Sequence, residues 1–292
     1  MLNSRGGIEC DLTVGRLAHD QFYITTGTGF ATHDLHWIRS NIPEGLHANV
    51  VDMTSGYAVL AIMGPRARDL LTALSPDDVS NAAFPFARMR RICVAGAPVL
   101  ALRVTYVGEL GWELHVPTEF AATVYEAITR ASAALGMIDA GYRAIESLRL
   151  EKGYRAWGSD ISPDHTPLQA GLGWAVKLKT ELPFLGREAL VKQRSAPLQR
   201  RLACFTVDDP DVILMGRETI YRDGERVGWL SSGGWGYTVE KNIGYGYVRN
   251  EAGVNRDFLR SGTYELEVAT VRVPTTLHMR PLVDPRMTRI KA

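Results

Sequence analysis

The chain has 292 residues, enough for one large domain or two smaller ones. Hydrophobic residues make up 46% and charged residues 22%, which is the composition of a folded protein with a sizeable core. Lys and Arg number 33 against 32 Asp and Glu, and this near-neutral balance argues against nucleic acid or an anionic membrane surface as a partner.

Three cysteines, Cys10, Cys93 and Cys204, lie far apart and lack the CxxC spacing of a metal or redox motif. They predict small buried thiols in a reducing compartment, with neither disulfides nor a metal site. No apolar run is long enough to cross a bilayer, and no signal peptide opens the chain. We therefore expect a cytoplasmic protein, or one of the mitochondrial matrix if the chain is eukaryotic.

The first predicted element is a strand over residues 8–17, which residues 21–26 can pair with. Its alternation places Asp11 and Thr13 on one face, which is either a solvated face or a functional one. A loop of small residues around Gly27 follows and permits close approach of a ligand or of another backbone. The glycines of this loop lack the spacing of a dinucleotide fingerprint, so no Rossmann unit is predicted.

Helices and strands alternate through the rest of the first two thirds of the chain. Helices are predicted over 32–41, from Pro65 onward, over 120–135, over 141–153 and over 184–192, and strands over 50–53, 57–63, 87–93 and 98–107. Gly136 and Gly153 are expected to end two of these helices, because glycine readily adopts the left-handed conformation of a C-terminal cap.

Residues 102–116 predict a β-hairpin, because apolar and polar residues alternate on both sides of a turn that contains Gly108 and Gly111. Glu113 would lie just inside the second strand, where a rigid element holds its carboxylate. A carboxylate there, near Tyr106, suits a ligand with paired N–H donors, such as an amino-substituted nitrogen heterocycle. The alternative is that Glu113 faces solvent and Tyr106 is part of the core.

The helix over 141–153 carries Arg143 and Arg149, and a guanidinium group can hold a carboxylate through two parallel hydrogen bonds. The alternative is a salt bridge to Glu146 or Glu151 on the same helix, which is the more common outcome.

The pattern changes after residue 153. His165 lies among turn residues with no second ligand at a metal-binding spacing, so a surface histidine is expected. The basic stretch 193–201 contains a proline and predicts a linker. From Leu202 onward, short strands separated by turns predict a small all-β barrel or sandwich.

Three segments carry, in order, a resemblance to a known family: RGGIECDL at 5–12, YVGELGWE at 106–113 and LRLEKG at 148–153. Together they resemble the folate-binding T-protein, or aminomethyltransferase, of the glycine cleavage system. Three further segments, over 154–158, 166–172 and 183–190, are more similar to the C-terminal halves of the flavin-dependent sarcosine and dimethylglycine dehydrogenases. The resemblance extends over nearly the whole chain.

The resemblance implies an α+β fold, with a cloverleaf folate-binding domain over residues 1–195 that is N-terminally incomplete and a C-terminal β-barrel over residues 196–292. It implies tetrahydrofolate as the ligand. Asp11 matches a carboxylate beside the reactive nitrogens of the folate, and Glu113 matches one that accepts hydrogen bonds from the aminopyrimidine edge. The other matched positions of the folate site are Thr13, Gly27, Phe86, Tyr106 and Arg149.

The chemistry implied is transfer of a one-carbon unit from a methylene-amine or iminium intermediate to tetrahydrofolate, as in glycine and choline–betaine catabolism. A carboxylate at Asp11 would stabilise the cationic iminium and accept the proton that leaves a folate nitrogen. No segment resembles a flavin-binding half, so this chain alone is expected to have no oxidase activity. FAD is expected on a separate amine-dehydrogenase domain or partner subunit.

Two alternatives share the same scaffold. In the first, the chain is a non-catalytic protein that keeps the folate fold for binding or regulation. In the second, it is a folate-dependent demethylase that acts on another methyl donor. A fold alone does not decide among these activities.

Overall fold

The computed structural model describes residues 1–292, and the chain divides into two compact units. The first unit contains residues 1–11 and 142–285, and the second contains residues 12–141 and 286–292. This division brings the first residues of the chain together with most of its second half. The domain boundary expected after residue 195 stays a prediction. None of the helices has the length and apolar character needed to span a membrane.

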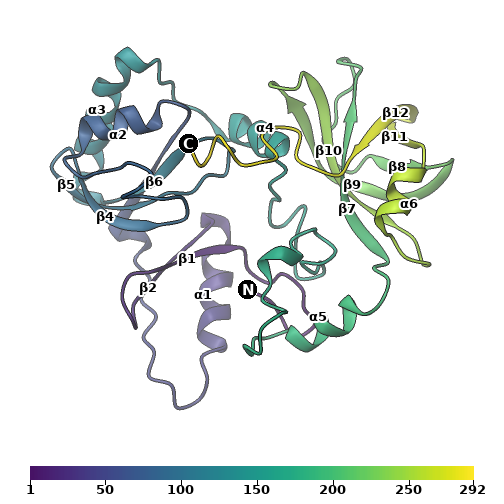
Figure 1. The fold of residues 1–292 in the computed structure, drawn as a ribbon, viewed down its shortest axis with the longest axis horizontal. Helices are drawn as coiled ribbons and strands as arrows, with labels where there is room; N and C mark the ends of the chain where they lie inside the picture. The colour runs from purple at the N-terminus through teal and green to yellow at the C-terminus, as the bar shows by residue number, and fades with distance from the viewer. The chain divides into compact units, whose positions relative to one another are not determined.

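The second unit is built on a four-stranded antiparallel sheet in the order β3-β6-β5-β4 (Figure 1). Its strands are β3 (Tyr57–Met63), β4 (Met89–Val94), β5 (Ala97–Leu102) and β6 (Gly111–Pro117). Helices α2 (Ala67–Leu74) and α3 (Ala121–Ser132) cover one face of the sheet. A two-stranded ribbon of β1 (Leu12–Arg16) and β2 (Phe22–Thr26) lies on the other face, and helix α1 (Ala31–Ser40) follows it.

The alternation predicted for the second strand of the hairpin is confirmed in β6. Trp112, Leu114 and Val116 are fully buried in the core that the sheet forms with α2 and α3. Because side chains alternate between the two faces of a strand, Glu113 and His115 point to the face that the β1–β2 ribbon covers. The packing of three large side chains thus determines where the carboxylate of Glu113 lies.

The first strand of the predicted hairpin is shorter than expected. β5 ends at Leu102 rather than at Val107, and Tyr106 lies in the following loop with 37% of its surface exposed. The chain turns there because the Val104 N–H donates to the carbonyl oxygen of Leu102, while the buried Arg103 side chain donates to the carbonyl oxygen of Phe84. Tyr106 is therefore not a core residue, and the core alternative for it is wrong.

The strand expected over residues 50–53 is also absent. The Asp52 carboxylate accepts hydrogen bonds from the backbone N–H and the hydroxyl of Thr54, which closes a local turn instead. Such side-chain bonds satisfy the backbone locally and compete with pairing in a sheet.

The first unit contains a closed six-stranded barrel with the strand order β10-β7-β12-β11-β8-β9, which confirms the predicted barrel (Figure 1). Its strands are β7 (Arg200–Val207), β8 (Thr219–Arg222), β9 (Glu225–Gly236), β10 (Lys241–Arg249), β11 (Tyr264–Val268) and β12 (Val271–His278). Helices α4 (Tyr142–Lys152), α5 (Arg187–Arg194) and α6 (Arg256–Ser261) complete the unit. Gly153 ends α4 with φ +72°, as expected for a glycine C-terminal cap.

The cysteines are free thiols, as predicted, and Cys10 and Cys204 are buried. Burial raises the pKa of Cys204 to about 12, so this thiol stays protonated and unreactive at neutral pH.

A buried ion pair joins α4, the loop after it and the barrel. Arg149 and Asp160 are both inaccessible to solvent, and Nη1 of Arg149 lies 2.6 Å from Oδ2 of Asp160. The Asp160 carboxylate also accepts from the hydroxyls of Ser231 and Ser232 on β9. The Asp160 carbonyl oxygen accepts from the Tyr247 hydroxyl on β10 at 2.8 Å. Asp160 therefore satisfies donors from three separate segments.

We predict that Asp160→Asn lowers the free energy of unfolding by about 3 kcal/mol, because it removes the fully buried counter-ion of Arg149 and leaves only the half-exposed Glu146 carboxylate beside the buried charge. Urea unfolding of the two proteins measures the difference. The matched control is Arg130→Gln, which breaks an exposed pair with Glu126 on α3. It should change the stability by less than about 0.5 kcal/mol. An equal effect of the two substitutions would contradict this account.

His165 is not the free surface histidine expected from its sequence neighbours. Its ring is stacked on that of Tyr247 with the centroids 4.3 Å apart, and Nδ1 lies 2.9 Å from the Ser162 hydroxyl. Burial lowers the pKa of His165 to about 4, and the positive charge of Arg200 acts in the same direction.

This shift predicts a pH dependence of stability. The unfolded chain protonates His165 near pH 6.5, whereas the folded chain does so only near pH 4, so the contribution is present above pH 6.5 and is lost as the pH falls toward 4. After allowance for solvent screening we expect a loss of about 1–2 kcal/mol. His165→Phe keeps the ring on Tyr247 and should flatten this part of a plot of stability against pH. Parallel plots for the two proteins would count against the assignment.

Candidate functional site

Three of the predicted site positions come from one end of the four-stranded sheet. The strand register pairs Met89 of β4 with Leu102 of β5, and Leu102 with Glu113 of β6. Phe86 lies just before β4 begins, and Tyr106 lies in the loop after β5 ends. Phe86, Tyr106 and Glu113 therefore lie at the same end of the sheet, where β4 starts, β5 ends and β6 starts.

The β1–β2 ribbon adds two more positions on this side. Gly15 of β1 packs so closely on the Met89 side chain that a Cβ atom at Gly15 would overlap the Met89 sulfur. Thr13 is two residues from Gly15, on the same face of the ribbon, and pairs with Thr25. Gly27 directly follows β2. The ribbon therefore places Thr13 and Gly27 on the element that lies over the start of β4.

On the ribbon side of the sheet, Glu113 lies between apolar neighbours and is partly exposed to solvent. Its cross-strand neighbours are Ala61 on β3 and Leu102 on β5, one small and one apolar. Its side chain is 27% exposed, so neither the solvent-facing alternative nor full burial describes it. A carboxylate in such a half-open apolar setting can accept paired N–H donors from a flat ring at little desolvation cost.

Two residues that the sequence analysis did not single out, His115 and Tyr23, form a linked pair next to Glu113. Nε2 of the buried His115 lies 3.8 Å from Oε2 of Glu113, and Nδ1 lies 3.2 Å from the Tyr23 hydroxyl. Burial raises the pKa of Tyr23, which keeps its hydroxyl protonated. A neutral imidazole that accepts the Tyr23 proton on Nδ1 carries its own proton on Nε2, facing Glu113.

His115 and Tyr23 differ in whether the sequence could have indicated them. His115 follows Glu113 at the two-residue spacing of a shared strand face, so the alternation of β6 could have indicated it. Tyr23 comes from β2, and nothing in the sequence links it to β6.

A buried carboxylate fixes the segment around Gly27. Asp34 on α1 accepts a hydrogen bond from the Thr26 hydroxyl and lies 2.9 Å from Nδ1 of His33. These contacts attach the start of α1 to the end of β2, on either side of Gly27. Asp34 lies within the predicted helix, where its apolar neighbours gave no sign of this role.

The first unit carries the other two predicted site residues. Asp11 is exposed and lies immediately before β1. Arg149 is fully buried, and its guanidinium donates to Glu146, Asp160 and Ser232. The salt-bridge alternative is therefore confirmed for Glu146. Glu151 instead accepts from the backbone N–H groups of Thr238 and Val239.

The elements described above form an α+β fold with a C-terminal barrel, and comparisons with known proteins agree. The GCVT N-terminal domain model matches residues 1–180, and the glycine cleavage T-protein C-terminal barrel domain model matches residues 200–284. The crystal structure of glycine cleavage system aminomethyltransferase T from Bartonella henselae superposes with a TM-score of 0.83 at 25% identity, covering 98% of this chain and 75% of that chain.

Two longer proteins are similar to the whole chain. Mitochondrial sarcosine dehydrogenase of Mus musculus is 43% identical over 307 residues, and mitochondrial dimethylglycine dehydrogenase of Mus musculus is 37% identical over 297 residues. Each alignment covers 100% of this chain and 33% of the relative, so the chain spans about a third of those proteins. The chain belongs to the glycine cleavage T-protein (aminomethyltransferase) family, which confirms the predicted fold class.

Proposed function

We propose that this chain binds tetrahydrofolate and transfers a one-carbon unit to it from an aminomethyl or iminium donor. The observation that supports the proposal most strongly is the Glu113 carboxylate, which β6 holds at the sheet end that also carries Phe86 and Tyr106. This arrangement occurs in a chain of the aminomethyltransferase family.

The proposed site fits the flat, donor-rich pterin ring. Glu113 would accept hydrogen bonds from the aminopyrimidine edge, and the buried His115, which contacts Tyr23, lies beside its carboxylate. Phe86 and Tyr106 provide aromatic surface for the ring. Gly27 allows the backbone to approach closely, and Thr13 provides a hydroxyl group that can donate or accept.

Asp11 is proposed as the catalytic carboxylate. Bound tetrahydrofolate supplies a nucleophilic nitrogen on which the one-carbon unit is carried. The ionised Asp11 side chain would stabilise the positive charge of the donor and then accept the proton released from the nucleophile. Asp11 is exposed, so solvent reaches this position.

We propose a framework role for Arg149 in this site. Its guanidinium is surrounded by Glu146, Asp160 and Ser232, so it would hold α4 and the loop around Asp160 in place rather than contact the ligand.

The one-carbon donor is proposed to come from a flavin-dependent amine dehydrogenase that oxidises a methylated glycine such as sarcosine or dimethylglycine. The names of the two longer relatives support this source. FAD would lie on a separate domain or subunit.

The decisive experiment supplies the chain with tetrahydrofolate and with an aminomethyl donor generated from sarcosine by a flavin-dependent oxidase. Rapid-quench analysis then measures 5,10-methylenetetrahydrofolate against free formaldehyde. We expect Asp11→Asn to lower the rate of folate product formation by about 100-fold or more, since it removes the proton acceptor. Tetrahydrofolate affinity should stay within about twofold of the unsubstituted chain, because Asp11 is assigned to the chemistry rather than to holding the pterin.

The matched control is Asp257→Asn, an exposed aspartate on α6 that should leave the rate unchanged. Undiminished transfer by Asp11→Asn would contradict the assignment of Asp11. Tight folate binding without any transfer above the uncatalysed rate would favour the non-catalytic alternative.

A further inference from the structure

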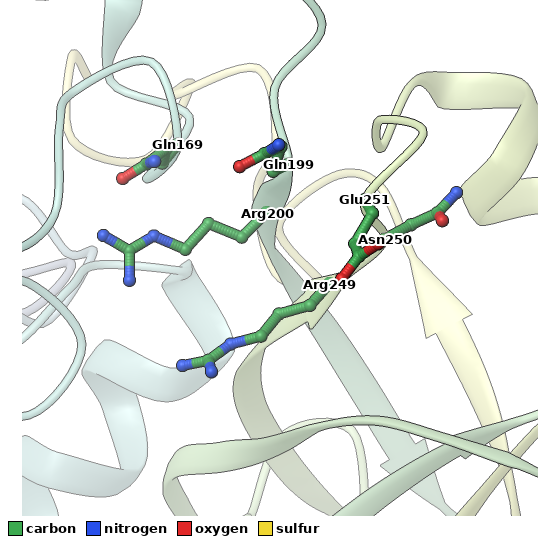
Figure 2. A pocket seen from close by; sticks show the side chains of 6 residues that line it. All are labelled: Gln169, Gln199, Arg200, Arg249, Asn250 and Glu251. Atoms are coloured by element: carbon green, nitrogen blue, oxygen red, sulfur yellow. The ribbon is translucent and has the colours of Figure 1, made fainter.

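A separate pocket lies in the first unit, beside the paired ends of β7 and β10. It has a volume of about 370 Å³. Its lining residues are Gln169, Gln199, Arg200, Arg249, Asn250 and Glu251 (Figure 2). None of them is a candidate folate residue, so the inference below is independent of the proposed function.

The strand register places two arginines opposite each other in this pocket. Arg200 begins β7 and pairs with Arg249, the last residue of β10. Directly opposed residues of an antiparallel pair point to the same face of the sheet, and like charges in this position are destabilising. Figure 2 shows the two side chains extended in the same direction. The fold therefore maintains an unfavourable pair at this position.

Aromatic rings hold both guanidinium groups. The guanidinium carbon of Arg249 lies 4.0 Å from the centroid of the Trp229 ring, and that of Arg200 lies 5.9 Å from the centroid of Tyr247. A guanidinium that packs against a ring by its face keeps the N–H groups of its edge available for a ligand. Trp229 thus orients the Arg249 charge without neutralising it, and the Tyr247 ring lies near the Arg200 charge.

No carboxylate neutralises the two charges. Glu251 lines the pocket, but neither arginine forms an ion pair with it, and Arg200 donates instead to the carbonyl oxygen of Asp164. Burial lowers the pKa of Arg249, and the charge of Arg200 adds to this effect. The pocket therefore has a positive potential.

The amide of Gln169 adds donors to the same wall. Its Oε1 accepts a hydrogen bond from the Thr166 N–H at 3.1 Å, and its NH₂ group can donate to a ligand. Two guanidinium edges and an amide NH₂ group favour a ligand with several acceptor oxygens.

We propose that this pocket binds a small oxyanion, a phosphate or carboxylate group, between the guanidinium groups of Arg200 and Arg249. Planar guanidinium groups match the paired oxygens of both anions, and a bound anion would relieve the repulsion between the two arginines. Phosphate and carboxylate groups would make the same contacts with the two arginines, and separate titrations with each anion show which one the pocket prefers.

Thermal unfolding and calorimetry of the full chain test the proposal, with inorganic phosphate and malonate as separate probes and sodium chloride at equal ionic strength as the reference. A ligand that binds the folded state raises the unfolding temperature. We expect one probe to raise the unfolding temperature more than sodium chloride, and the stronger probe identifies the preferred anion. The variant R200Q/R249Q should bind that anion at least about tenfold more weakly, because it loses two charge-assisted contacts.

The matched control is R272Q, because Arg272 is also stacked on an aromatic ring of the barrel, that of Tyr221, but lies outside the pocket. It should keep the affinity of the unsubstituted chain. In anion-free buffer R200Q/R249Q should unfold at the same temperature as the unsubstituted chain or higher, since the repulsion is removed. Equal shifts with sodium chloride and both probes, or undiminished binding by R200Q/R249Q, would overturn the proposal.

Discussion

The candidate site depends on the alternation of one strand. Trp112, Leu114 and Val116 of β6 fill the core beneath α2 and α3, and a shift of one residue would expose all three. The hydrophobic free energy of these side chains therefore fixes the register of β6. That register holds Glu113 on the opposite face beside His115, so the carboxylate proposed to bind folate is positioned by three core side chains.

A second constraint acts in the first unit. Burying a guanidinium and a carboxylate costs desolvation free energy, which is offset only when good geometry and further hydrogen bonds satisfy both groups. Arg149 and Asp160 meet this condition because Asp160 receives donors from α4, from β9 and from its own loop. The pair therefore specifies how the loop packs on the barrel. Glu113 lies partly open, whereas Arg149 is enclosed by its protein partners.

Local patterns predicted much of the fold. The β6 alternation, the glycine cap at Gly153 and the barrel strands depend on short-range periodicity or on backbone conformation, and all are confirmed. The end of β5 could not be predicted, because the Arg103 side chain donates to the carbonyl oxygens of Phe84 and Ala292, both distant in sequence. The stacking of His165 on Tyr247 and the contact of Tyr23 with His115 likewise need the tertiary structure. For the site, the sequence could indicate Glu113 and, by the alternation of the strand, His115, but not Tyr23.

The most direct test of the central claim is a calorimetric titration of the chain with tetrahydrofolate, repeated for Glu113→Gln and for the control Glu265→Gln on β11. The account predicts saturable binding that Glu113→Gln weakens by about tenfold or more, since a charged acceptor is lost. Glu265→Gln should bind like the unsubstituted chain. Absence of binding by the folded chain, or equal affinity for all three proteins, would contradict the claim that β6 presents a folate-binding carboxylate.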